Sequence, residues 1–227
     1  MTEMSTDTAS IINAEAHPVS VRLGSAPLHH DRLTVAFRPI LAIPHLLLVG
    51  GPVAAALWMT SHEDARPAYE WTAGGGVFGA AAAVIAIIAW FAIVFTGRYP
   101  AGLWSIVAFY LRWRVRASAY TALLRDEYPP FGDEPYPAAL VLSPPAGPRH
   151  RVSAGFRVVL VIPHLVVLWL LGIAWTFTTI VAWFAILLTG RFPRPLYEFG
   201  AGALQWNARV EAYLLLLHDD YPPFGFD

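Results

Sequence analysis

The sequence predicts an all-α integral membrane protein made of two tandem helical-hairpin repeats. Of its 227 residues, 56% are hydrophobic and only 14% are charged, a balance far from that of a soluble domain. It contains apolar runs of the length needed to cross a bilayer, about 20 residues each. A long segment also occurs twice, because residues 90–132 align with 183–225 without a gap. These observations together indicate a duplicated membrane unit.

The boundaries of the duplication follow from two alignment shifts. The shift is 93 positions over 90–132 but 119 positions upstream, where 37–45 aligns with 156–164, so the first copy carries 26 extra residues. A repeat of this kind decides the architecture of a chain. We predict a disordered cytoplasmic tail at 1–16, a first repeat at 17–132, a linker at 133–135 and a second repeat at 136–227. The tail lacks the basic-then-apolar pattern of a signal peptide.

The first repeat contains two apolar runs, which predict spans at about 39–60 and 74–97 around a polar loop at 61–73. The second repeat has a single apolar stretch of 33 residues, at 158–190. Two full spans need about 40 residues, whereas one helix of that length would reach ~50 Å and require strong tilt. Because both copies end on the same motif, we predict two short spans, at about 157–172 and 175–190, with a turn near Gly172–Thr176. The fold is therefore four transmembrane helices.

A further helix follows each hairpin, at about 101–125 and 195–218. The first carries Arg112, Arg114 and Arg116, which do not form a clean amphipathic stripe, since Arg114 lies nearly opposite the other two. We interpret both segments as interfacial helices, which either lie at the interface or pack on the hairpin. The three arginines would contact anionic lipid or simply hold this end in the cytoplasm.

Short extended segments open each repeat, at 18–23 and 138–142, and a second pair follows at 33–37 and 152–156. They predict either irregular chain or a small β-hairpin on the cytoplasmic side.

Each predicted hairpin ends on a shared motif, Thr-Gly-Arg-Tyr-Pro at 96–100 and Thr-Gly-Arg-Phe-Pro at 189–193. A glycine can adopt the left-handed conformation that closes a helix, and the proline prevents the helix from continuing. Arg98 and Arg191 then lie at a helix C-terminus, where a guanidinium can reach lipid headgroups. We interpret the motif as a helix stop and interface anchor.

The distribution of arginine predicts the orientation in the cell inner (plasma) membrane. Arginines precede and follow both hairpins, while the loop at 61–73 has one arginine against three acidic residues. By the positive-inside rule, the protein is multi-pass with both termini in the cytoplasm and this loop outside.

The strongest candidates for an intramembrane site are two repeated dipeptides, Pro44-His45 and Pro163-His164. Each histidine lies seven residues beyond an arginine, about 10 Å along a helix. An ionisable side chain at that depth is a functional candidate. We favour a structural role, in which a neutral histidine satisfies the backbone carbonyl that the proline frees. The alternatives are a proton or ion pathway and a ligand for metal or haem.

No other catalytic constellation is present in the sequence. The chain has no cysteine, which excludes thiolate chemistry, and no lysine, which excludes Schiff-base catalysis. Its net charge of −1 gives no indication of nucleic-acid binding. The acidic pairs at 126–127 and 219–220 are interpreted as solvated helix stops, followed by Tyr-Pro-Pro-Phe segments that pack back on their own repeat. We therefore expect no enzyme activity, no metal and no cofactor.

The repeated Ile-Pro-His, the Trp-Phe-Ala-Ile run that ends in Thr-Gly-Arg, and the closing Tyr-Pro-Pro-Phe resemble the bacterial family called domain of unknown function 4389. The resemblance covers nearly the whole chain after residue 16, as two tandem copies. It implies a membrane protein, often from actinobacteria, with no established activity and no assigned catalytic residues.

The sequence thus favours a scaffold or accessory protein that binds the lipid bilayer, including anionic lipid, or a membrane-protein partner. The first alternative is a small channel or transporter that uses His45 and His164, and the second is a haem-binding electron carrier. An oligomer is compatible with all three.

Overall fold

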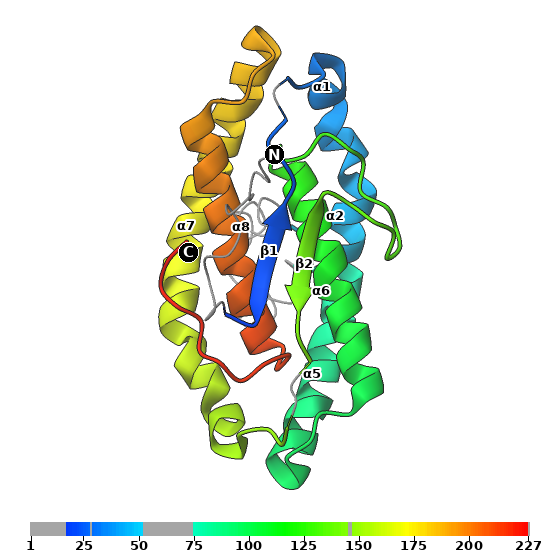
Figure 1. Ribbon diagram of the computed structural model, residues 1–227, viewed down its shortest axis with the longest axis vertical. Coiled ribbons are helices and arrows are strands. Elements are labelled where there is room, and N and C mark those ends of the chain that lie inside the picture. The colour runs from blue at the N-terminus through cyan, green and yellow to red at the C-terminus, as the bar shows by residue number, and fades with distance from the viewer. Residues whose placement is uncertain (1–16, 28, 52–74, 145–146, 227) are drawn as a thin grey trace, which may run out of the picture.

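The computed structural model describes residues 17–27, 29–51, 75–144 and 147–226. The predicted tail, the loop at 61–73 and the end of the first predicted span lie outside the described residues. The described chain is mostly helical, which agrees with the all-α expectation, and adds one small sheet. Its elements are β1 (Val19–Leu23), α1 (Arg32–Leu41), α2 (Ile43–Val49), α5 (Gly76–Thr96), α6 (Ala101–Thr121), β2 (Ala138–Leu142), α7 (Arg151–Thr189) and α8 (Arg194–Leu214) (Figure 1).

The predicted turn near Gly172–Thr176 is wrong, because α7 is one unbroken helix of 39 residues. Nothing in this stretch breaks a helix: Gly172 is followed by apolar residues, and the Thr176 hydroxyl donates to the Gly172 carbonyl at 2.8 Å. Such a bond to the preceding turn lets a threonine remain inside a helix. The extended segments predicted at 33–37 and 152–156 are also helical, since they form the first turns of α1 and α7.

The first repeat contains the same long helix in an interrupted form. Helices α1 and α2 align with residues 151–168 of α7, and α5 aligns with 169–189, so the 26 extra residues occupy 50–75. A break at Ala42 bends α1 and α2 by 41°. Helix α5 begins directly against the end of α2, because a Cβ on Gly76 would lie 2.7 Å from the backbone nitrogen of Gly50. The insertion therefore splits a helix that is continuous in the second repeat.

The molecule has three layers (Figure 1). The two-stranded sheet packs on α6 and α8, and these pack in turn on α2 and α5 and on α7. The sheet is antiparallel with Val21 opposite Leu140, so each repeat contributes one strand. The predicted extended segments at 18–23 and 138–142 thus pair with each other across the two repeats, rather than forming a hairpin within one.

The two repeats are related by an approximate two-fold axis perpendicular to the long helices. The His30 backbone nitrogen donates to the Gly190 carbonyl at 3.1 Å, and the equivalent Arg149 nitrogen donates to Gly97 at 2.9 Å. The start of each long helix therefore lies at the end of the other. The antiparallel sheet is centred on the same axis, because Val21 and Leu140 are themselves equivalent positions.

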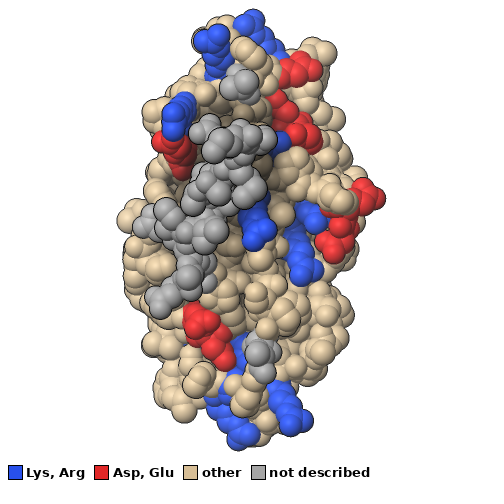
Figure 2. Space-filling model, viewed as in Figure 1, with Lys and Arg blue, Asp and Glu red and all other residues tan. Residues whose placement is uncertain are grey.

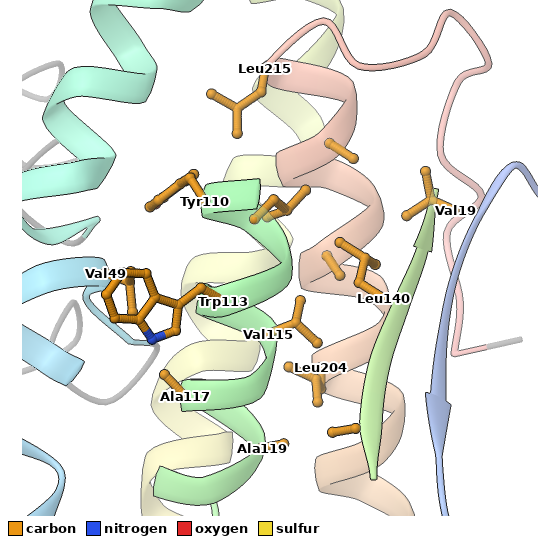
Figure 3. Packing of buried hydrophobic residues seen from close by; sticks show 14 of the residues in the cluster. Val19, Val49, Tyr110, Trp113, Val115, Ala117, Ala119, Leu140, Leu204 and Leu215 are labelled. Atoms are coloured by element: carbon orange, nitrogen blue, oxygen red, sulfur yellow. The ribbon is translucent and has the colours of Figure 1, made fainter. Parts of the chain in front are cut away.

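The helices predicted as interfacial, at 101–125 and 195–218, are present as α6 and α8. They form the central layer, and in each of them 11 of the 21 residues are buried. Figure 3 shows this core, with Val115 and Leu204 pointing into the space between α6 and α8 and Leu140 reaching in from β2. These helices contact protein on two sides, which explains why the sequence shows no clean amphipathic stripe.

Two of the described helices, α5 and α7, are long and apolar enough to cross a membrane, or three if the bent pair α1–α2 counts as one span. Side chains such as Phe177 and Leu188 are 67% and 77% exposed on α7. An apolar surface of this extent is typical of a membrane protein.

Candidate functional site

Two of the predicted site residues, Arg98 and Arg191, directly follow the C-terminal caps of α5 and α7. Gly97 and Gly190 take φ values of 72° and 74°, and their N–H groups donate to Ile93 and Ile186. The left-handed cap predicted from the Thr-Gly-Arg motif is thereby confirmed. Arg98 and Arg191 are exposed beside these caps, and their contact with lipid stays a prediction.

His45 lies in an aromatic cage in the protein interior, with no exposed surface. The Trp113 indole donates to its Nδ1 at 3.0 Å. The ring stacks on Phe131 at 4.5 Å, and Tyr128 lies 5.0 Å away, so the cage is closed by the Tyr-Pro-Pro-Phe segment. The predicted packing of this segment on its own repeat is confirmed.

The second repeat builds the same cage around His164. The Trp206 indole donates to Nδ1 at 3.2 Å, Phe224 stacks on the ring at 3.9 Å, and Tyr221 lies at 4.9 Å. An indole N–H can only donate, so Nδ1 of each histidine is unprotonated and the ring is neutral with its proton on Nε2. The Nε2 atoms of both histidines are buried and form no hydrogen bond within the described chain.

The histidines are held by their aromatic neighbours and not by the backbone carbonyl that each proline was expected to free, because Nδ1 accepts the indole and Nε2 forms no hydrogen bond within the described chain. Each cage is made by residues of one repeat, and nothing in the described part of the chain brings His45 and His164 into a shared site. Pro44 lies in the first turn of α2, whereas Pro163 is inside the continuous α7. A proline frees the carbonyl four residues before it, which for Pro163 is that of Val159. The neighbouring Leu160 carbonyl accepts the Tyr221 hydroxyl at 3.1 Å.

A second pair of clusters lies close by and was not anticipated from the sequence. Arg157 is completely buried and donates to the Tyr213 and His218 carbonyls at 3.0 and 2.6 Å, while its other Nη bonds Asp219 at 2.8 Å. Its guanidinium lies 4.2 Å from the Tyr213 ring centre. Asp219 also pairs with Arg149 at 2.8 Å.

The equivalent cluster in the first repeat is built on Arg38. It donates to the Tyr120 and Arg125 carbonyls at 3.3 and 2.9 Å and pairs with Asp126 at 2.6 Å. Here the second partner of Asp126 is His30, at 2.6 Å. The signal in the sequence was the repetition of Phe-Arg at 37–38 and 156–157 together with the closing aspartates, but nothing local indicates that they meet.

The two aspartates differ from the predicted solvated helix stops. Burial by itself raises the pKa of Asp126, but the hydrogen bonds from His30 and Arg38 outweigh it and hold the pKa below its usual range. Burial likewise raises the pKa of Asp219, and the charge of Arg149 with the surrounding hydrogen bonds lowers it overall. Both carboxylates are therefore ionised, and their ion pairs join the C-terminal end of each repeat to its long helix.

The family of this chain is decided by its match to one family model. The model described as Domain of unknown function (DUF4389) matches residues 75–132 and 151–225, more than half of the chain. The chain belongs to this family. No curated protein and no solved structure matches the chain. The second DUF4389 match contains α7 and α8, and the first begins where α5 resumes after the insertion.

Within the part of the chain that the structure describes, a polar cluster around Arg114 and Glu211 is not repeated across the two-fold axis. Arg114 pairs with Glu211 at 2.8 Å and donates to the Val49 carbonyl at 2.8 Å, and the Tyr110 hydroxyl donates to Glu211 at 3.1 Å. Burial raises the pKa of Tyr110, so the phenol stays protonated. The position equivalent to Arg114 is Asn207.

The prediction that Arg114 and Arg116 contact lipid is wrong. Arg114 of α6 bonds Glu211 of α8 and the Val49 carbonyl of α2. Arg116 donates to the Gly132 carbonyl at 2.6 Å and pairs with Asp133 at 3.0 Å. Arginines inside a membrane protein that find carbonyl and carboxylate partners do not need headgroups. Arg112 is half-buried, and its contact with anionic lipid stays a prediction.

The described residues contain no group of three or more His, Asp or Glu side chains placed to hold a metal ion. Two open grooves of about 660 and 590 Å³ lie at the surface, the first beside Arg98 and Trp104 and the second beside Asp31 and Asp126. Neither groove is lined by His45 or His164. The charged side chains of the polar clusters in the DUF4389 repeats are bonded to one another, which suits them to stabilising the fold.

Proposed function

We propose that this DUF4389 protein is a non-enzymatic accessory protein of the inner membrane, which acts by binding lipid or a membrane-protein partner. The observation that carries the proposal is where its polar and apolar side chains lie. The buried polar groups are bonded to one another at the repeat ends, while large apolar side chains are exposed along the outer helices.

The exposed apolar surface supports lipid as the first partner. Phe156, Phe177 and Leu188 are each more than 60% exposed on α7. Burial of apolar surface stabilises by about 25 cal/mol per Å², so this surface strongly favours hydrocarbon over water. The arginines at the ends of the long helices support a cytoplasmic location for those ends.

Membrane fractionation tests this proposal. We expect the protein to stay with the membrane pellet after an alkaline carbonate wash and to be released by mild detergent. Purification in mild detergent should then retain lipid, detected by native mass spectrometry, or a stoichiometric protein partner. Recovery of the folded protein in the soluble fraction would contradict the proposal.

The channel alternative rests on the Nε2 atoms of His45 and His164, which are buried without an ordinary hydrogen bond. Proteoliposomes separate it from the accessory function. We expect no proton or ion flux above that of empty vesicles. Flux that depends on the wild-type protein and disappears in the His45→Phe variant would establish the channel instead.

The haem alternative has less support, because Nδ1 of each histidine already accepts an indole N–H and a phenylalanine covers the ring face. We expect the purified protein to be colourless. A Soret band that is lost in the His164→Phe variant would reverse this conclusion.

A further inference from the structure

We propose that the long helices lie along the plane of the membrane: α7 and the interrupted helix α1–α2–α5 embed their outer side in the cytoplasmic leaflet, while the sheet faces the cytoplasm. The proposal rests on the membrane location proposed above and replaces spanning helices by a protein seated in one leaflet. The approximate two-fold axis then coincides with the membrane normal.

The length of α7 is the first argument. Its 39 residues extend over about 58 Å, and the 33 residues between Arg157 and Arg191 over about 50 Å. The hydrocarbon core is about 30 Å thick. A spanning α7 would need a tilt of roughly 50°, beyond the observed range of about 0–40°.

The charges at the two ends of the molecule are the second argument. The start of each long helix meets the end of the other across the two-fold axis, because the His30 N–H donates to the Gly190 carbonyl and the Arg149 N–H donates to the Gly97 carbonyl. Arginines consequently gather at both ends of the long axis, as Figure 2 shows. Helices perpendicular to the membrane would place similar positive charge on both sides, against the positive-inside rule. Helices in the plane place all of it at one interface.

The sheet is the third and strongest argument. It covers α6 and α8 midway along the long axis (Figure 1), so a molecule standing across the bilayer would hold the sheet at the depth of the hydrocarbon. Strand β1 carries the exposed Arg22, and the exposed Asp133 and Glu134 lie in the segment that leads into β2. Figure 2 shows charge of both signs over the middle of this side. An open two-stranded sheet with exposed charges is not compatible with lipid hydrocarbon.

The opposite side has the chemistry that lipid requires. The exposed apolar side chains of the described chain belong mainly to the outer layer and include Phe37, Ile40 and Leu47 of α1–α2, Val84, Ile87, Phe91 and Phe95 of α5, and Phe156, Val166, Trp169, Phe177 and Leu188 of α7. A helix is about 10 Å across, so one layer of helices fits within a leaflet of about 15 Å, half the hydrocarbon thickness.

Trp169 is consistent with this placement. It is exposed near the middle of α7. In a spanning helix it would lie at the centre of the bilayer, whereas tryptophan prefers the interfacial region. In a helix that lies in the plane, the middle is at the same depth as the ends.

Cysteine accessibility tests the proposal directly, because the chain contains no native cysteine. Three single variants at exposed positions are made: Arg98→Cys at one end, Arg194→Cys at the other, and Asp133→Cys on the sheet side. In intact spheroplasts we expect no labelling of any of them by a membrane-impermeant maleimide, and full labelling after permeabilisation. Phe177→Cys should resist the reagent in both states until the protein is denatured in detergent.

The outcomes are decisive. Labelling of Arg98→Cys or Arg194→Cys in intact spheroplasts means that the two ends lie on different sides, or on the outer side, and overturns the proposal. Thermal unfolding of each variant in detergent controls for correct folding. If the protein is absent from membranes altogether, the proposed function fails as well; if it is in membranes but its two ends label differently, only the in-plane placement fails.

A second measurement uses the purified wild-type protein in aligned bilayers. Polarised infrared spectroscopy reports the mean angle between helix axes and the membrane normal. Because the long helices and the central helices run roughly along one molecular axis (Figure 1), we expect an amide I dichroism of helices close to the plane. Dichroism of helices near the normal would overturn the proposal.

Discussion

Removing the carboxylate of Asp219 is the sharpest test of the Arg-Asp clusters. This side chain is 18% exposed and pairs with Arg149 and Arg157, which are 2% and 1% exposed. The Asp219→Asn variant keeps the shape but leaves two buried guanidinium groups without their counter-charge. Each charge-assisted hydrogen bond contributes about 1.5–3 kcal/mol, and loss of one partner of a buried pair costs about 3–5 kcal/mol.

Because Asp219 is partly exposed, solvent reduces the effect, and we expect a loss of about 3 kcal/mol in the free energy of unfolding. On the scale for domains of this size, about 2–4 °C per kcal/mol, the midpoint should fall by roughly 6–12 °C. The assay is thermal unfolding in mild detergent, followed by the fluorescence of the nine tryptophans.

The neighbouring Asp220 provides the matched control. It is exposed and has the same charge, so Asp220→Asn should change the free energy of unfolding by less than about 0.5 kcal/mol. If the two variants unfold at the same temperature, the Arg-Asp cluster does not hold the repeat end in place, and the reasoning is refuted.

Three further predictions follow from other contacts. Gly97 has a φ of 72°, so Gly97→Ala should lower the free energy of unfolding by about 1–2 kcal/mol. A Cβ on Gly102 would lie in open space, so Gly102→Ala should be neutral or stabilising. Equal effects of the two variants in thermal unfolding would exclude a left-handed cap at Gly97. Burial lowers the pKa of His218 to about 3 in the folded protein. Below pH 6.5 the unfolded chain binds this proton and the folded one does not, so the free energy of unfolding should fall by about 1.4 kcal/mol for each unit by which the pH is lowered from 6.5 to 3. A His218→Gln variant with the same pH dependence would contradict this. Trp206→Phe should lose about 1 kcal/mol through the bond to His164, and a double-mutant cycle with His164→Phe should show coupling between the two.

Local features of this protein were predictable from its residues. The left-handed caps at Gly97 and Gly190 depend only on the backbone freedom of glycine and on the proline that follows. The helices after each cap, and the packing of Tyr-Pro-Pro-Phe on its own repeat, were also predictable, because a repeated order of apolar and polar residues must form the same local structure twice.

The unbroken helix α7 was not predictable in the same way. Its 33 apolar residues fit one long helix or two short ones equally well by periodicity. The assumption that every long apolar helix crosses the bilayer favoured two. The packing of α7 against α8 and against both ends of the interrupted helix decides for one.

Composition and repetition by themselves indicated the membrane class, the duplication and the left-handed helix ends at Gly97 and Gly190. The tertiary structure alone decided which side chains meet: Arg38 with Asp126, 88 positions away, and β1 with β2 from the other repeat. The physical reason is that hydropathy and turn chemistry act over a few residues, whereas the approximate two-fold axis brings together groups that no local pattern connects. The same axis places arginines at both ends of the long helices, and this arrangement supports our proposal that the protein lies along the membrane.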